Sequence, residues 1–176
     1  MDRRQKLIIA ALLVLCFVVI GSFINEFFGF FSFAAYEIFC TVLFSGILYA
    51  IRKEFKNEFA RYLAYFCILY ALVLYSAFAL VNIKEPVTNM DIFIILIMGI
   101  IVINILFRVI FGKSTVEGKV ILSDSEIAVV ELPFDLFAGI SSGRYVVETS
   151  KKLEKGKIVK VLIKRTFFKR IPDRVL

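Results

Sequence analysis

The sequence contains no histidine, the side chain that most often serves as a general base or a zinc ligand. A Ser-His-Asp triad is therefore excluded. Three cysteines, Cys16, Cys40 and Cys67, lie within apolar runs and lack the paired spacing of a metal or redox site, so we interpret them as structural thiols. Phosphate-binding glycine loops, nucleophile elbows and calcium-binding loops are also missing. We expect no enzymatic activity, no cofactor and no metal site.

Apolar residues, in contrast, are in excess. They make up 60% of the 176 residues, compared with about 45–50% in an ordinary soluble domain. Four runs, which contain none of the prolines, are long enough to cross a bilayer as helices: 7–24, 27–51, 62–83 and 92–107. An isolated segment in lipid must be helical to satisfy its own backbone. We therefore predict a four-helix transmembrane domain over residues 1–112.

The charges between these runs predict an orientation. The first run is longer than the apolar part of a signal peptide and has no A-x-A cleavage site, so we interpret it as an uncleaved helix. The loop after it carries only Asn25 and Glu26, and the loop at 84–91 has a single cation. The other side of the membrane receives nine Lys or Arg from the N-terminus, the loop at 52–61, Arg108 and Lys113. The positive-inside rule predicts a multi-pass cell-membrane protein with both termini in the cytoplasm.

Residues 113–176 have a different pattern, because short alternating stretches replace the long apolar runs. We predict five strands, separated by turns rich in Ser, Asp and Gly, at 116–122, 126–132, 145–149, 157–165 and 166–171. Five short strands predict a small all-β barrel, either OB-like or SH3-like. With 13 Lys/Arg against 8 Asp/Glu, it would be a basic cytoplasmic domain.

Cations are concentrated toward the end of this domain. The candidate contacts for anionic lipid or for a protein partner are Lys160, Lys164, Arg165, Lys169 and Arg170. Binding of nucleic acid would need exposed aromatic residues beside them, and Phe167 and Phe168 are the one such cluster. Adjacent residues of a strand face opposite sides, so at most one of them could stack on a base. We therefore favour lipid or protein over nucleic acid.

Polar residues inside the predicted helices form a second candidate site. Glu37 lies about ten residues into the second run, and a carboxyl group inside a membrane suggests a function because exposing it to lipid is costly. Structural alternatives are a position nearer the headgroups, a protonated side chain, or a hydrogen bond to Tyr75 or Ser76 at similar depth. Asn104 lies too far along the helix to reach Glu37, and we expect it to form a hydrogen bond between helices.

The order of parts resembles the short NfeD-like membrane proteins, which have membrane helices followed by an OB-fold. The closest local similarity is in GRYVV at 143–147 and LEKGKIVKV at 153–161, while the L-x-P-x-G element of that family is missing after Leu132 and Pro133. The resemblance implies an accessory role beside stomatin/prohibitin-type membrane proteins. The serine protease domain of the long members is absent, so proteolysis is not implied. Mechanosensitive channels are a less similar alternative, because their pore helix is rich in Gly and Ala and the fourth run here is rich in Ile.

These observations predict a non-enzymatic membrane scaffold or accessory protein. Its barrel would contact a membrane-associated protein or anionic lipid, and a second copy of the chain is a further candidate partner. The alternative function is a small transporter or channel that uses Glu37. The two predictions differ in that only a transporter should produce a flux that depends on this side chain.

Overall fold

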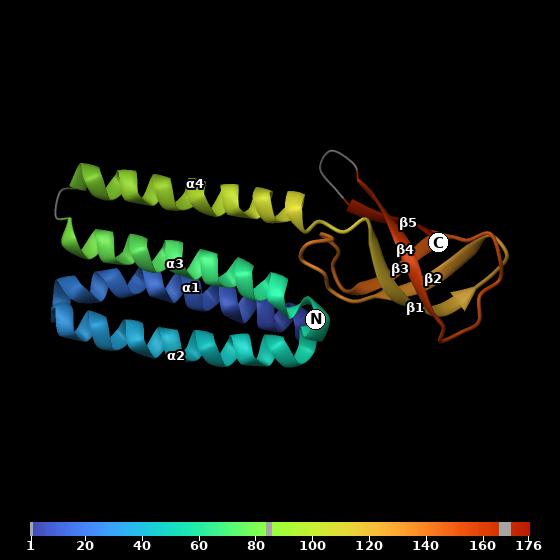
Figure 1. Cartoon of the computed structure of the whole chain (residues 1–176), viewed down its shortest axis with the longest axis horizontal. Helices are drawn as coiled ribbons and strands as arrows, with labels where there is room; N and C mark the ends of the chain where they lie inside the picture. The colour runs from blue at the N-terminus through green and yellow to red at the C-terminus, as the bar shows by residue number, and fades with distance from the viewer. Residues whose placement is uncertain (1, 84–85, 166–169) are drawn as a thin grey trace. The chain divides into compact units, whose positions relative to one another are not determined.

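The computed structural model describes residues 2–83, 86–165 and 170–176 (Figure 1). Contacts divide the chain into two compact units. One comprises Lys6–Leu106, and the other combines Met1–Gln5 with Phe107–Leu176. The first unit is helical, and the second contains all the strands. We describe each unit separately.

Within the described residues, four helices are long and apolar enough to cross a membrane. They are α1 (Arg3–Phe28), α2 (Phe30–Phe55), α3 (Phe59–Asn82) and α4 (Pro86–Ile110), with a short 3-10 helix η1 (Lys56–Glu58) before α3. The four predicted spans are therefore confirmed; α1 and α4 extend beyond their apolar runs at both ends, whereas α2 and α3 do so at one end only. Proline at the first position of α4 is favourable, because that residue needs no backbone N–H partner.

The turn between α1 and α2 differs from the prediction. Asn25 and Glu26 were expected in a loop, but they belong to α1, which continues to Phe28. The chain reverses at Gly29, whose φ of 79° lies in the left-handed region that favours glycine. Its N–H donates to the carbonyl of Asn25 at 3.0 Å. A single glycine can therefore join the two helices, so the polar pair before it does not mark the turn.

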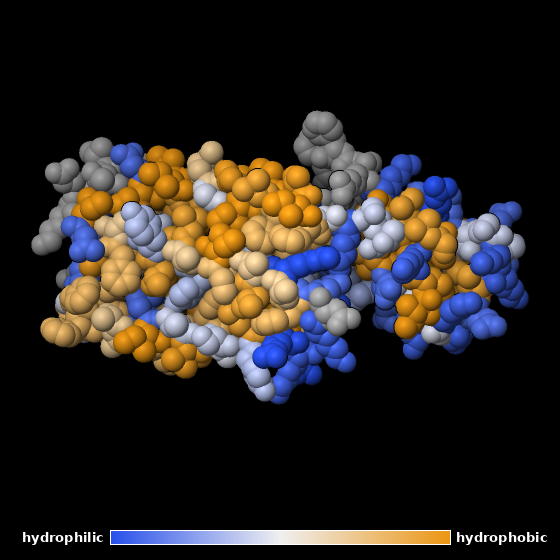
Figure 2. All heavy atoms as spheres, in the orientation of Figure 1, coloured by the Kyte–Doolittle hydropathy of each residue, from blue (hydrophilic) through white to orange (hydrophobic). Residues whose placement is uncertain are grey.

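Aromatic side chains form much of the core of the helical unit. Phe33 of α2 makes an edge contact with Phe78 of α3, with ring centroids 5.3 Å apart. In the same interface, the ring of Phe44 of α2 stacks on the ring of Tyr70 of α3, with ring centroids 4.5 Å apart. The outward side chains are also apolar, as the orange surface over the helices shows (Figure 2). A surface of this kind is expected where lipid tails, rather than water, surround a helix bundle.

The second unit contains a closed five-stranded barrel. Its strands are β1 (Thr115–Ser123), β2 (Ile127–Leu132), β3 (Gly143–Glu148), β4 (Ile158–Arg165) and β5 (Arg170–Val175). The order around the barrel is β1-β2-β3-β5-β4. Neighbours pair antiparallel except β3 and β5, which are parallel and pair through Glu148 and Arg174. The predicted all-β barrel is therefore confirmed.

The last strand extends further along the chain than predicted. The prediction of 166–171 overlaps β5 only at its first two residues, and 166–169 lie outside the described residues. The strand instead continues through Pro172, which was expected to lie beyond it. Pro172 pairs with Ile163 at a register irregularity of β4, between Leu162 and Ile163. Such an irregularity tolerates proline because the regular ladder of hydrogen bonds is interrupted there.

Alternate residues of the strands fill the barrel. The buried side chains include Val120, Val130, Val147, Val161 and Ile163. Gly118 of β1 also faces inward, where a Cβ atom would overlap the side chains of Leu132 and Val130. The glycine is therefore needed for close packing of β1 against β2. The alternation also fixes which residues of each strand face outward.

Candidate functional site

An apolar patch lies on the outer surface of the barrel. In the strand register, Leu122 of β1 is paired with Val129 of β2, which is paired with Val146 of β3. Leu122 is 62% exposed, Val146 is 65% exposed, and Ile127, two residues before Val129, is 52% exposed. We call Leu122, Ile127, Val129 and Val146 the apolar barrel face. Clustered exposed apolar side chains of this kind often mark interaction sites.

Charged residues of both signs border the apolar barrel face. In the neighbouring row of the register, Lys119, Glu131 and Arg144 follow one another across β1, β2 and β3. On the other side, Ile127 is paired with Glu148, which is paired with Arg174. All five charged side chains are exposed or partly exposed. The border therefore alternates in sign, unlike the uniformly basic surface that a polyanion selects.

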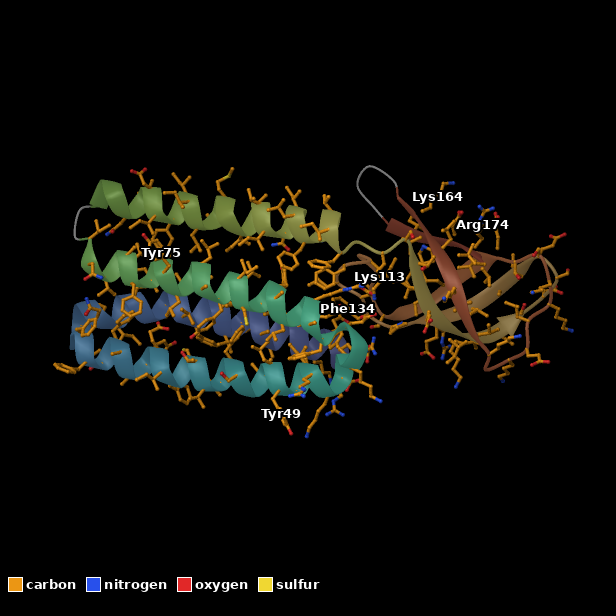
Figure 3. All side chains as sticks on the ribbon, in the orientation of Figure 1. Tyr49, Tyr75, Lys113, Phe134, Lys164 and Arg174 are labelled. Atoms are coloured by element: carbon orange, nitrogen blue, oxygen red, sulfur yellow. The ribbon has the colours of Figure 1, made fainter. Side chains whose placement is uncertain are left out.

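The five predicted lipid or partner contacts belong to the β4–β5 region. Lys160 and Lys164 are exposed on the outer face of β4, and Figure 3 labels Lys164 on the barrel. Lys160 is paired in the register with Glu117 of β1, an acidic neighbour that reduces the local positive charge. Lys169 lies outside the described residues. Arg165 and Arg170 pair with each other where β4 and β5 meet, and only their backbone is described.

The barrel unit contains an ion pair, between Lys113 and Asp135, that the sequence did not predict. The Lys113 ammonium group lies 2.8 Å from Oδ2 of Asp135, whose side chain is 6% exposed. Oδ1 of Asp135 accepts the backbone N–H groups of Phe137 at 3.0 Å and Ala138 at 2.9 Å. The backbone of Asp135 also bridges to Ile140. Asp135 therefore organises the β2–β3 connection, at the place where the L-x-P-x-G element of the NfeD-like proteins is missing.

Three phenylalanines form a cluster in the same unit. Phe137 lies 6.3 Å from Phe107 and 6.1 Å from Phe111, measured between ring centroids. Phe107 and Phe111 lie 5.2 Å apart. Phe107 belongs to the last turn of α4, so the cluster links the end of this helix to the β2–β3 connection within the second unit. Nothing in the sequence singled out these three residues as a cluster, because phenylalanine is common throughout the chain.

Glu37 is buried in the helical unit, with 5% of its surface exposed. It lies on the inward side of α2, between Phe33 and Cys40. No described residue donates a hydrogen bond to either carboxyl oxygen. The expected bonds to Tyr75 and Ser76 are therefore not formed, and Ser76 donates to the carbonyl of Leu72 instead. Burial without a partner makes Glu37 the most unusual polar group among the described helices.

Tyr75 and Asn104 do not join Glu37 in one site. Tyr75 of α3 is 75% exposed, and Figure 3 labels it beside this helix. Asn104 of α4 accepts a hydrogen bond from the Tyr65 hydroxyl of α3 at 2.8 Å. Its amide nitrogen donates to the carbonyl of Ile100. The hydrogen bond between helices expected of Asn104 is thus present, with Tyr65 as a partner that the sequence did not suggest.

The comparison with protein families covers almost the whole chain. A family model described as "Predicted membrane protein (DUF2101)" matches residues 3–176, which includes the four helices and all five strands. The chain belongs to the DUF2101 family. No curated protein and no solved structure matches it significantly. The DUF2101 match supports the assignment to membrane proteins, and the resemblance to NfeD-like proteins stays a prediction.

Proposed function

We propose that this DUF2101 protein is a non-enzymatic membrane scaffold whose barrel binds another protein through the apolar barrel face. The observation that carries the proposal is the exposure of Leu122, Ile127 and Val146 in one patch. An exposed apolar centre with a polar border is the usual arrangement of a protein interface. The small size of the patch suits a weak or transient complex.

The charges at the border favour a protein over anionic lipid as the partner. Lys119 and Arg144 lie on either side of Glu131 in the register, and Arg174 pairs with Glu148. A lipid surface attracts clusters of cations, and an acidic residue between them weakens that attraction. A protein can match both signs, which provides specificity.

The resemblance to NfeD-like proteins suggests the class of protein to which the partner belongs. The strand order β1-β2-β3-β5-β4 with parallel β3 and β5 supports the OB-like alternative over the SH3-like one. Members of that family are expected to act beside stomatin/prohibitin-type membrane proteins, so we propose a partner of this type. We further propose that the chain lies in the cell membrane with its barrel and both termini in the cytoplasm, as the loop charges predict.

A crosslinking experiment in native membranes tests the scaffold. A photoreactive amino acid at Val146 of the full-length chain should crosslink to a stomatin/prohibitin-type protein, identified by mass spectrometry. The same amino acid at Lys160 should not, because β4 lies outside the apolar barrel face. Crosslinks from Val146 only to lipid, or only to a second copy of the chain, would contradict the proposal.

A pair of charge substitutions provides the matched control. Val146→Asp should abolish co-purification of the partner, because it places a charge within the apolar barrel face. Lys152→Asp, in the exposed β3–β4 connection, should leave co-purification unchanged. Equal recovery of the partner with both variants would show that this face is not the binding site.

The burial of Glu37 favours a second candidate function, a small transporter or channel. Reconstituted vesicles distinguish the two functions. A scaffold should produce no ion flux and no flux that depends on pH. A flux present in the wild type and lost in Glu37→Gln would instead support transport.

A further inference from the structure

The surroundings of Glu37 are buried, and its carboxyl oxygens have no described hydrogen-bond partner. Glu37 lies on the buried side of α2, and the neighbouring positions on that side are Phe33, Cys40 and Phe44. Along α2, contacts with α3 lie both before and after Glu37. Phe33 contacts Phe78, and the Thr41 hydroxyl oxygen is 2.6 Å from the Tyr70 hydroxyl oxygen. The buried residues of α3 between these contacts are Val73, Ser76 and Ala77. Most of the buried residues on these parts of α2 and α3 are therefore apolar.

Helix α1 closes the remaining side. A Cβ atom placed on Gly21 would overlap Oε1 of Glu37 and would lie 2.7 Å from the Tyr36 ring. The backbone of α1 therefore approaches the carboxyl group as closely as glycine allows. The Tyr36 hydroxyl donates to the carbonyl of Phe17 at 3.2 Å, which holds α1 and α2 together beside this contact.

The Thr and Ser hydroxyl groups in this region already donate hydrogen bonds to backbone carbonyls. Thr41 donates to the backbone carbonyl of Glu37 itself at 2.7 Å. Ser76 donates to the carbonyl of Leu72 at 2.9 Å, and Ser22 donates to that of Val19 at 2.7 Å. Consequently, no described hydroxyl donates to the carboxyl oxygens, which have no hydrogen-bond partner.

Positive charges on the described parts of these helices are distant. Lys6 is fifteen residues from Gly21, Arg52 is fifteen from Glu37, and Arg61 is fifteen from Ser76. Fifteen residues of helix extend over about 22 Å. The titratable groups near Glu37 are Tyr36 and Cys40 on α2 and Tyr70 on α3. The residue of α1 beside it, Gly21, has no titratable side chain. None of these is a cation, and Lys84 lies outside the described residues.

We propose that Glu37 is a proton-binding site inside the helical unit and that its side chain carries a proton while α1, α2 and α3 are packed together. A carboxylate with neither a cation nor a hydrogen-bond donor among its described neighbours is strongly disfavoured in such surroundings. A proton is also the one ligand that needs no additional space beside Gly21. This inference is independent of the scaffold function.

Release of the proton would be coupled to the packing of α1. An ionised Glu37 needs water or a cation beside it, and the close approach of Gly21 prevents entry on that side. Ionisation therefore requires α1 to move away from α2 at Gly21. The site would in this way link pH to the packing of the first two helices.

Infrared spectroscopy of the full-length protein in phosphatidylcholine vesicles tests the site directly. At neutral pH the wild type should show the C=O stretching band of a protonated carboxylic acid, and Glu37→Gln should lack it. Glu131→Gln, on the exposed barrel surface, should keep the band. Absence of the band from the wild type, or an unchanged band in Glu37→Gln, would overturn the proposal.

A second measurement uses the wild type alone and so does not depend on whether a variant folds. As the pH is raised, the acid band should disappear. Over the same change of pH, amide hydrogen exchange around Gly21 should become faster. Loss of the band with unchanged exchange would overturn the coupling to helix packing. Crosslinking through Val146 should be the same in Glu37→Gln, which separates this test from that of the scaffold.

Discussion

Lys113 and Asp135 form an ion pair of 2.8 Å across 22 residues of sequence. Asp135 is buried and also accepts two backbone N–H groups, so its carboxylate satisfies three donors. Removing a buried charged partner leaves the remaining charge without compensation. This ion pair therefore makes the β2–β3 connection a sensitive point of the barrel unit.

Asp135→Asn should destabilise the barrel by ~2 kcal/mol, because the amide keeps an acceptor oxygen but loses the charge that binds Lys113. Urea unfolding of the full-length protein in detergent, followed by circular dichroism in the β region, would measure the change. Glu126→Gln, at an exposed position before β2, is the control and should change stability by less than about 0.5 kcal/mol. Equal effects of the two substitutions would contradict the structural role of the pair.

Two adjacent valines of β3 should differ strongly in how much the same substitution destabilises the barrel. Val147 is 2% exposed inside the barrel, and Val146 is 65% exposed outside it. Val147→Asp should destabilise the barrel by more than about 4 kcal/mol, since it buries an unpaired charge. Val146→Asp should cost less than about 0.5 kcal/mol, and thermal unfolding would compare them. A register shifted by one residue would reverse the result.

The hydrogen bond between Tyr65 and Asn104 should contribute measurably to the association of α3 with α4. A double-mutant cycle with Tyr65→Phe and Asn104→Leu should give a coupling energy of about 0.6 kcal/mol, with an upper limit near 1.7 kcal/mol. Reversible unfolding in detergent micelles can measure each variant. A coupling energy of zero would mean that the two side chains do not interact in the protein.

Two glycines in the helices should differ in their tolerance of alanine. Gly21→Ala should destabilise the helical unit by about 1–3 kcal/mol, because its methyl group would overlap Glu37 and Tyr36. Gly46 has nothing within 4 Å of a Cβ atom. Gly46→Ala should be neutral or stabilise by up to about 1 kcal/mol, since alanine favours helix. The unfolding temperatures of the two variants in detergent provide the comparison.

Cysteine labelling of intact cells should establish the orientation. In a variant with Cys16, Cys40 and Cys67 replaced by serine, Asn82→Cys should react with a membrane-impermeant maleimide. Lys157→Cys should react only after the cells are lysed, because the positive-inside rule places the barrel in the cytoplasm. Labelling of Lys157→Cys in intact cells would refute this orientation.

The sequence alone determined the four helices and the existence of the barrel. A long apolar run in lipid has one stable conformation, and alternation with period two identifies a half-buried strand, so both signals are local. Local signals failed at Gly29 and at Pro172. In the first case one glycine was enough to form the turn, and in the second an irregular pairing with Ile163 accommodated proline within β5.

The candidate sites depended on contacts that are distant in sequence. Asp135 was visible as an acid among apolar residues, but its pairing with Lys113 follows from the path of the chain. Leu122 and Val146 became one surface only because the register brings β1, β2 and β3 together. For Glu37 the sequence showed a carboxyl group inside a span, and the tertiary structure added the close approach of Gly21 and the lack of a described partner. Composition and periodicity thus determined the elements, whereas the packing between them decided which side chains are exposed, paired or isolated.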